Sequence, residues 1–113
     1  MNTIRFGVIG CGHIGKRHAE MITRNANATL VALCDILPPE TLQIQSYQTN
    51  FYNNISALLS AEPDIDVINI CTPNGLHASH AIQALQAGKH VVIEKPMALT
   101  SADCDLIIDT AAQ

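Results

Sequence analysis

The chain turns from an apolar strand, residues 4–9, into a helical pattern at Val8-Ile9-Gly10-Cys11-Gly12-His13-Ile14-Gly15. The three glycines of this stretch have the spacing G-x-G-x-x-G. In such a turn the first glycine allows the bend, the second lets the backbone approach a pyrophosphate, and the third lets the helix pack closely on the strand. Backbone amides at the start of the helix, including those of His13 and Ile14, would face the phosphates. The stretch therefore predicts a dinucleotide site.

Asp35 supports the same prediction. It lies twenty residues after Gly15, at the end of a second apolar segment, residues 30–34. A carboxylate there can accept hydrogen bonds from the adenosine ribose. It would repel a 2′-phosphate, and the neighbouring Ile36 supplies no cation, so we expect NAD as the cofactor, with NADP disfavoured. The alternative is an ordinary acid that caps the following segment.

Composition excludes several classes of protein. The chain has 113 residues, of which 48% are hydrophobic and 14% charged, which predicts one domain, residues 1–113, with an aliphatic core. The net charge of −4 gives no cationic surface for nucleic acid, so a nucleic-acid partner is not expected. No apolar run approaches the length that spans a bilayer, so no membrane partner is expected either.

The cysteines predict no metal site. Cys11, Cys34, Cys71 and Cys104 include no close pair of the kind that zinc sites use. We interpret them as four buried, reduced thiols, which suits a cytoplasmic protein. Residues 1–3 lead directly into the first strand and leave no room for a signal peptide, which also favours a soluble cytoplasmic protein.

Strands alternate with helical patterns along the rest of the chain. Further strands are predicted at 67–71 and 90–93, and turn residues end the intervening helices at Pro63 and Gly88. The last helix is predicted to start at a capping box of Thr100 and Asp103. Its inward stripe is predicted to be Cys104, Ile107, Ile108 and Ala111. Residues 36–54 fit a helix or an extended chain equally well. The pattern predicts an α/β fold, a Rossmann-type doubly wound parallel sheet.

Two segments after strands could carry chemistry. Thr72, Pro73 and Asn74 follow the strand at 67–71, at the edge where open α/β sheets bind ligands. The alternative is turn chemistry alone, with Asn74 as a helix cap. Lys95 follows a buried strand and precedes a proline that restricts its backbone, and it is the candidate catalytic residue. The alternative is a surface lysine at the end of a strand.

Together these motifs resemble the Gfo/Idh/MocA oxidoreductase family over essentially the whole chain. The resemblance rests on the glycine stretch with His18, on Asp35, on Cys71-Thr72-Pro73-Asn74-Gly75-Leu76-His77, on Ala87-Gly88-Lys89-His90-Val91 and on Glu94-Lys95-Pro96. The family comprises NAD(P)-dependent enzymes of sugars, nucleotide sugars and polyols. Its members add a C-terminal α/β domain that builds the substrate pocket and carries a catalytic His or Asp.

The resemblance implies roles for individual residues. Lys95 would lie beside the nicotinamide and hydrogen-bond the reacting hydroxyl, and the Lys95–Pro96 bond would be cis. Asn74 and His77 would border the cofactor, whereas Glu94 would orient Lys95 or border the cofactor. His80 is expected at the surface, and His18 in the core or at the cofactor's edge. The stretch from Thr72 to His77 is similar to that of members acting on nucleotide-linked N-acetylated sugar acids.

The resemblance thus implies the cofactor-binding domain of an NAD-dependent sugar or polyol oxidoreductase, with a small sugar-type substrate and a homo-oligomeric full-length form. Two alternatives are an NAD-dependent glycosidase of the same family and a non-catalytic NAD-binding or redox-sensing module. Residues 36–54 depart from the family's longer helical connection. Because the C-terminal domain has no counterpart here, we expect the 113-residue chain to bind NADH without turnover.

Overall fold

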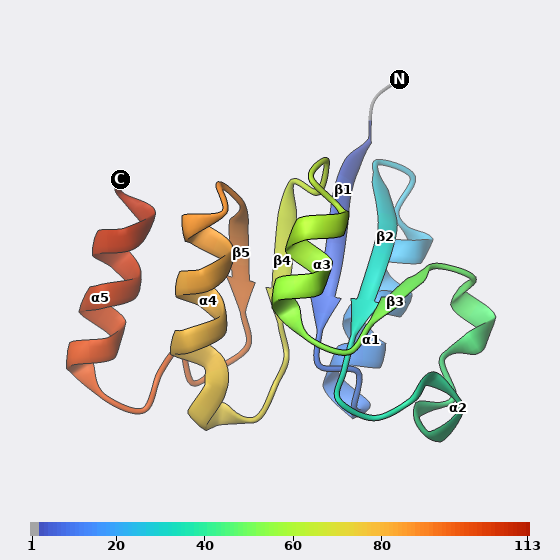
Figure 1. The fold of residues 1–113 in the computed structure, drawn as a ribbon, viewed down its shortest axis with the longest axis horizontal. Coiled ribbons are helices and arrows are strands. Elements are labelled where there is room, and N and C mark those ends of the chain that lie inside the picture. The colour runs from blue at the N-terminus through green and yellow to red at the C-terminus, as the bar shows by residue number, and fades with distance from the viewer. Residues whose placement is uncertain (1–2) are drawn as a thin grey trace.

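The computed structural model describes residues 3–113 and forms a five-stranded parallel sheet flanked by helices (Figure 1). Met1 and Asn2, on which the expectation about the start of the chain partly rests, lie outside the described residues. The elements are β1 (Ile4–Ile9), α1 (His13–Arg24), β2 (Ala28–Cys34), α2 (Pro39–Leu42), η1 (Gln45–Tyr47), β3 (Asn50–Tyr52), α3 (Ile55–Ala61), β4 (Val67–Ile70), η2 (Asn74–Leu76), α4 (His77–Gln86), β5 (His90–Ile93) and α5 (Ser101–Ala111).

The strand order is β3-β2-β1-β4-β5, which confirms the predicted Rossmann-type fold. From β1 the chain moves outward to β2 and β3, then crosses back to β4 on the other side of β1. All strands are parallel, so their carboxyl ends share the lower edge of the sheet in Figure 1. The order reverses between β1 and β4, and the loops that follow these strands diverge there. That crevice is where doubly wound sheets bind ligands.

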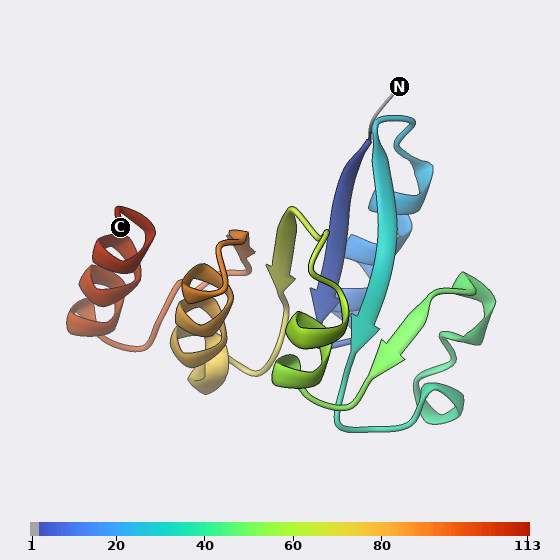
Figure 2. The same cartoon turned by 45° about the horizontal axis from the view of Figure 1, so that its top comes forward.

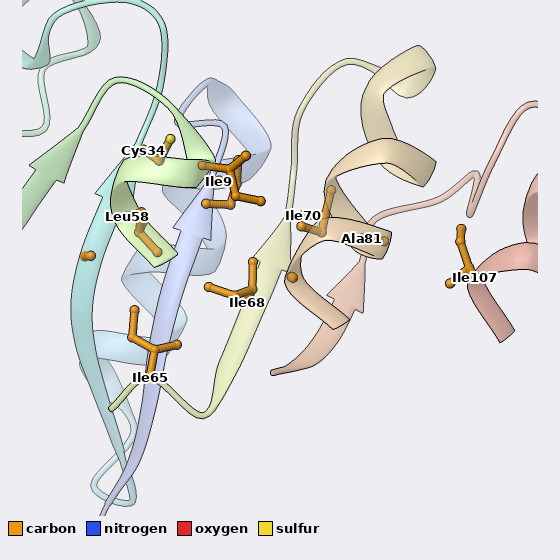
Figure 3. Packing of buried hydrophobic residues seen from close by; sticks show 11 residues of the cluster. Ile9, Cys34, Leu58, Ile65, Ile68, Ile70, Ala81 and Ile107 are labelled. Atoms are coloured by element: carbon orange, nitrogen blue, oxygen red, sulfur yellow. The ribbon is translucent and has the colours of Figure 1, made fainter. Parts of the chain in front are cut away.

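The core has two layers because neighbouring strand residues point to opposite faces. Val8 and Leu33 pack under α1. On the opposite face, Ile9 and Cys34 lie beneath α3 and Ile70 lies beside α4 (Figure 3). The α1 layer consists of Val8, Cys11, Ala19, Ile22, Leu33, Leu42 and Ile44. The opposite layer consists of Ile9, Ala32, Cys34, Ile55, Leu58, Ile65, Ile68, Ile70, Ala81, Ala84 and Ile107. The core is aliphatic, as the composition predicts.

The last helix corrects one prediction. The Thr100 hydroxyl accepts a hydrogen bond from the Asp103 amide at 3.1 Å, so the predicted cap is confirmed. The predicted inward stripe is wrong beyond Ile107: Ile108 is 57% exposed and Ala111 is exposed. The reason is the position of α5, which lies beyond α4 at the β5 end of the sheet in both views (Figures 1 and 2). Ile107 is the buried residue of α5 and packs in the layer that contains Ala81 and Ala84 of α4.

Residues 36–54, for which the sequence left two interpretations open, combine both. A single helical turn, α2, is followed by the 3₁₀ turn η1 and the short strand β3, which pairs with β2. Leu42 and Ile44 are buried beneath α1. The Lys16 ammonium donates to the Leu42 carbonyl at 3.1 Å and ties this connection to α1.

The cysteines correct a second prediction in part. Cys11 and Cys34 are buried, but Cys71 and Cys104 are only partly so, and all four are unpaired thiols. Within residues 3–113, no three His, Cys, Asp or Glu side chains are grouped to hold a metal ion. Over the same range, no helix is long and apolar enough to cross a membrane.

Candidate functional site: the carboxyl edge of the sheet

Two of the three motif glycines are required by packing. Gly10 has φ +90°, and a Cβ on it would lie 2.7 Å from the Cys71 backbone. A Cβ on Gly15 would lie 1.7 Å from the carbonyl oxygen of Gly10. No side chain fits at either position, so these glycines allow α1 to start directly against the end of β1 and the loop after β4.

Gly12 is different. Its φ of −72° and ψ of −158° are open to any residue, and nothing lies within 4 Å of a Cβ built on it. The fold therefore gives no reason for glycine at this position. A side chain would instead occupy the space just outside the loop, where a bound diphosphate would need to approach the backbone. This open position fits a dinucleotide.

No side chain at the start of α1 neutralises the partial positive charge of the helix N-terminus. Gly12 is the N-cap and supplies no side-chain hydrogen bond, and the first turn contains no acidic residue. The first amides of an α-helix have no acceptor within the helix, and its N-terminus carries partial positive charge. The exposed His13 and Ile14 occupy this turn, so their amides are placed to receive an anion.

Asp35 holds the glycine loop. Its Oδ2 accepts a hydrogen bond from the Cys11 amide at 2.8 Å, and its Oδ1 accepts one from the Leu37 amide at 2.9 Å. The second bond is the local turn that the capping alternative predicts. The side chain is half-buried, and each carboxylate oxygen can accept a further bond. Bracing the loop is thus compatible with binding a ribose, which stays a prediction.

A cavity of about 500 Å³ opens beside Asp35. Its walls are proline, aromatic and aliphatic side chains, with one amide, from the segment after β2, from β3 and the residue after it, and from α3. They are Ile36, Leu37, Pro38, Pro39, Phe51, Tyr52, Asn53 and Ala57. Apolar walls with a few polar groups are typical of small-molecule sites. The connection that the sequence left open therefore builds one wall of a cavity at the carboxyl edge, next to the residue predicted to bind the ribose.

The loop after β4 leads along the same edge. Thr72 is half-buried, whereas Pro73 and Asn74 are exposed. The alternative role of Asn74 as a helix cap is wrong, because the caps of η2 and α4 are Pro73 and Leu76, and neither helix has a side-chain cap bond. Asn74 lies exposed at the start of η2, and its contact with a cofactor stays a prediction.

His77 lies beneath this loop. It is 1% exposed, with Nδ1 at 2.7 Å from the Pro96 carbonyl oxygen and Nε2 at 2.7 Å from the Thr72 carbonyl oxygen. Its ring is occupied on both sides by backbone of the two loops at the edge. This bridge could not be predicted from the sequence, because a His at the start of a helix indicates only that it lies near the ligand edge.

His80 corrects the expectation of a surface residue. It is half-buried, and its Nδ1 lies 3.0 Å from the Thr72 hydroxyl oxygen. Burial, with a smaller effect of the nearby His77, lowers the pKa of His80 below its ordinary value. A lowered pKa keeps this imidazole neutral near pH 7, so its Nδ1 can accept a hydrogen bond from the Thr72 hydroxyl.

The segment after β5 presents Lys95. The Lys95 side chain is exposed and has no hydrogen bond within residues 3–113, whereas the ammonium groups of Lys16 and Lys89 each donate to a backbone carbonyl. The Lys95–Pro96 bond is cis, which confirms the expectation from the resemblance. Within the described part of the chain, Lys95 is thus the one lysine whose ammonium has no partner, and it lies at the edge where the predicted ligand would bind.

Glu94 and His18 form an ion-pair contact that sequence reasoning missed. His18 Nε2 lies 2.8 Å from Glu94 Oε2, with side chains 19% and 34% exposed. The Asn69 amide nitrogen lies 3.0 Å from His18 Nδ1, so Nδ1 accepts and Nε2 donates to the carboxylate. The sequence signal for this network was Asn69, a polar residue inside the apolar strand β4.

The fold, the glycine loop and the open edge define a Rossmann-type dinucleotide-binding domain. The model of the Gfo/Idh/MocA oxidoreductase family, described as having an NAD-binding Rossmann fold, matches residues 4–113. The chain belongs to this family, as the sequence motifs predicted.

Relatives of several activities share this domain. An inositol 2-dehydrogenase of Rhizobium meliloti is 37% identical over 98% of this chain and 34% of its own length. A glycosyl hydrolase family 109 protein of Shewanella pealeana is 34% identical over 98% of this chain and 26% of its own. The WlbA dehydrogenase of Bordetella pertussis, solved with NADH and UDP-GlcNAcA, is 38% identical, with a TM-score of 0.89 over 98% of this chain and 35% of that one. The chain thus spans about a third of the length of these dehydrogenases.

Proposed function

We propose that this chain is the cofactor-binding part of an NAD-dependent oxidoreductase that transfers hydride at a carbinol carbon of a sugar, nucleotide sugar or polyol. The observation that carries the proposal is the open space around Gly12. This residue is a glycine that the fold does not need, at the start of a helix whose first turn has no acidic residue. A diphosphate bound there explains both features.

The carboxylate of Asp35 favours NAD over NADP. It lies at the end of β2 between the glycine loop and the cavity of about 500 Å³, where the ribose of a cofactor would fall if its base entered the cavity. A 2′-phosphate there would meet a negative charge, and the adjacent Ile36, which is 88% exposed, offers no cation. Hydrogen bonds to charged groups contribute about 1.5–3 kcal/mol, which corresponds to at least about tenfold discrimination.

Lys95 is the proposed catalytic residue. Bound nicotinamide supplies the hydride acceptor or donor. The Lys95 ammonium, which has no partner within residues 3–113, would hydrogen-bond the reacting oxygen of the substrate. In oxidation it would lower the pKa of the hydroxyl as hydride leaves, and in reduction it would polarise the carbonyl. The substrate pocket and a second proton-transfer group are proposed to come from residues outside this chain.

A nucleotide-linked N-acetylated sugar acid is the substrate that the resemblance of the Thr72–His77 stretch favours. The solved WlbA relative, whose complex contains UDP-GlcNAcA, supports this choice. Inositol and simple sugars remain the alternatives, supported by the Rhizobium meliloti relative.

The test is turnover by the protein in its full natural length, followed as NADH absorbance, with UDP-GlcNAcA and myo-inositol as the probes. Lys95→Ala is expected to lower kcat by about 10²-fold or more, while the affinity for NADH changes little. His90→Ala, a substitution of an exposed residue at the opposite edge of the sheet, is the matched control. Unchanged turnover in Lys95→Ala would contradict the catalytic role of Lys95. Binding of NADH without turnover by the full-length natural protein would instead support a non-catalytic NAD-binding module.

An NAD-dependent glycosidase is the second candidate, supported by the Shewanella pealeana relative. Such a cycle oxidises and then reduces the same sugar, so it would release a cleaved glycoside without net NADH. Accumulation of NADH in step with product would exclude it.

A further inference from the structure

Two histidines hold the segment that carries Lys95. His18, from α1, contacts the Glu94 carboxylate with Nε2 at 2.8 Å. His77, at the start of α4, contacts the Pro96 carbonyl oxygen with Nδ1 at 2.7 Å. The residues on both sides of Lys95 are thus anchored, and Lys95 itself is not.

The second nitrogen of each ring reaches the β4 side of the site. His18 Nδ1 accepts from the Asn69 side chain at 3.0 Å, and His77 Nε2 lies 2.7 Å from the Thr72 carbonyl oxygen. Asn69 is in β4, and Thr72 follows it in the loop. Each ring therefore bridges the carboxyl end of β4 and the segment after β5.

The two bridges restrain the segment beyond what the sheet does. The ladder between β4 and β5 continues to the Glu94 amide, which donates to the Ile70 carbonyl at 3.0 Å. Beyond Glu94, the contact of Pro96 with His77 links the chain to the loop after β4, because His77 also contacts Thr72. Burial of His77 at 1% exposure shields that contact from competing water.

We propose that His18 and His77 are positioning residues that fix the Glu94–Pro96 segment so that the Lys95 ammonium points along the carboxyl edge toward a bound cofactor and substrate. Neither histidine touches the reacting atoms; both act through the backbone and carboxylate that flank Lys95. A catalytic group must be held by such supporting contacts, because a displacement of about 1 Å lowers rates strongly. The inference rests on the proposed function.

The test follows the Lys95 side chain directly. The protein is reductively methylated with ¹³C-formaldehyde, which labels its lysines, and the Lys95 signal is assigned by its loss in Lys95→Arg. The shift of this signal on adding NADH is then compared between the natural protein and His18→Ala, His18→Gln, His77→Ala and His77→Gln. His90→Ala is the control, because its side chain is exposed at the far edge of the sheet.

The Ala variants are expected to lose most of the NADH-induced shift of Lys95, while their affinity for NADH falls by less than about tenfold. The Gln variants retain an N–H donor and are expected to recover part of the shift. His18 is partly exposed, so its variants remain informative even if His77→Ala fails to fold.

Two outcomes separate failure of the inference from failure of the proposed function. If the natural protein binds no NADH, the proposed function fails. If it binds NADH and the histidine variants give the natural Lys95 shift at full saturation, the positioning role is excluded while the proposed function stands.

Discussion

The Cys11 amide donates a hydrogen bond to the Asp35 carboxylate over 2.8 Å, so the acid at the end of β2 directly restrains the glycine loop at the end of β1. Asp35, the residue expected to bind the ribose, thus also braces the glycine loop. Ribose selectivity and loop geometry are coupled, and a substitution at Asp35 acts on both. The choice of substitution therefore decides which effect is measured.

Asp35→Asn keeps an oxygen that can accept from Cys11 but removes the charge. We expect the ratio of NADPH to NADH dissociation constants to fall by about tenfold, because the repulsion of a 2′-phosphate is lost. Asp35→Ala removes the brace as well, so binding of both cofactors should weaken. Fluorescence titration with each cofactor measures the ratio, and an unaltered ratio in Asp35→Asn would contradict the assignment of this acid to the ribose.

The glycines of the loop should separate fold from binding. Gly15→Ala would force a methyl group to within 1.7 Å of the Gly10 carbonyl oxygen, so we expect it to lower the free energy of unfolding by more than about 3 kcal/mol. Gly12→Ala projects into open space and should change it by less than about 1 kcal/mol. Urea unfolding followed by circular dichroism compares the two. Equal losses would show that Gly12 also has a packing role.

The packing of α5 is tested by two adjacent isoleucines. Ile107 is 2% exposed and Ile108 is 57% exposed. Ile107→Ala should cost about 2–4 kcal/mol because it opens a cavity between α5 and α4. Ile108→Ala should cost less than about 0.5 kcal/mol. Ile108→Ala is the control for Ile107→Ala. If urea unfolding gave similar losses of unfolding free energy for both variants, α5 would also pack through its outer face.

The thiols near the site should be unreactive in the folded protein. Burial raises the pKa of the Cys11, Cys34 and Cys71 thiols to about 12. At pH 8 their thiolate fraction is then about a thousandfold below that of an ordinary thiol, and alkylation by iodoacetamide should be slower accordingly. Mass spectrometry of native and urea-unfolded samples measures the difference, and native labelling of these cysteines at the unfolded rate would refute their burial.

The same shifts predict sensitivity to alkali. Between about pH 9 and 12 the unfolded chain releases thiol protons that the folded chain retains, so the unfolded state binds fewer protons and stability falls as pH rises. Thermal unfolding at pH 8 and pH 10 checks this direction. A midpoint that rises with pH over this range would contradict it.

The sequence was sufficient for the sheet and the phosphate loop because both depend on short-range patterns. Apolar strands and the glycines at 10, 12 and 15 are visible without tertiary context. The 36–54 connection has no dominant period, and its path depends on contacts such as Lys16 with Leu42. Helical spacing predicted that Ile108 faces the core. It is exposed because α5 lies at the end of the sheet, which the sequence pattern does not reveal.

The network around Lys95 could not be predicted for a different reason. Its contacts join residues far apart in the chain, such as His18 with Glu94 and His77 with Pro96. A histidine in a motif predicts proximity to a site, but which groups its two nitrogens meet is set by the packing of α1 and α4 on the sheet. The helix-cap alternative for Asn74 failed similarly, because a 3₁₀ turn, η2, precedes α4.

The most direct test of the account is a calorimetric titration with NADH of the natural chain and of Gly12→Val, in which a side chain fills the open space outside the loop. We predict saturable binding by the natural chain. We predict that Gly12→Val binds at least about a hundredfold more weakly while its unfolding midpoint stays close to that of the natural chain. Equal affinity in a folded Gly12→Val, or the absence of binding by the natural chain, would contradict the dinucleotide site on which the proposed hydride transfer depends.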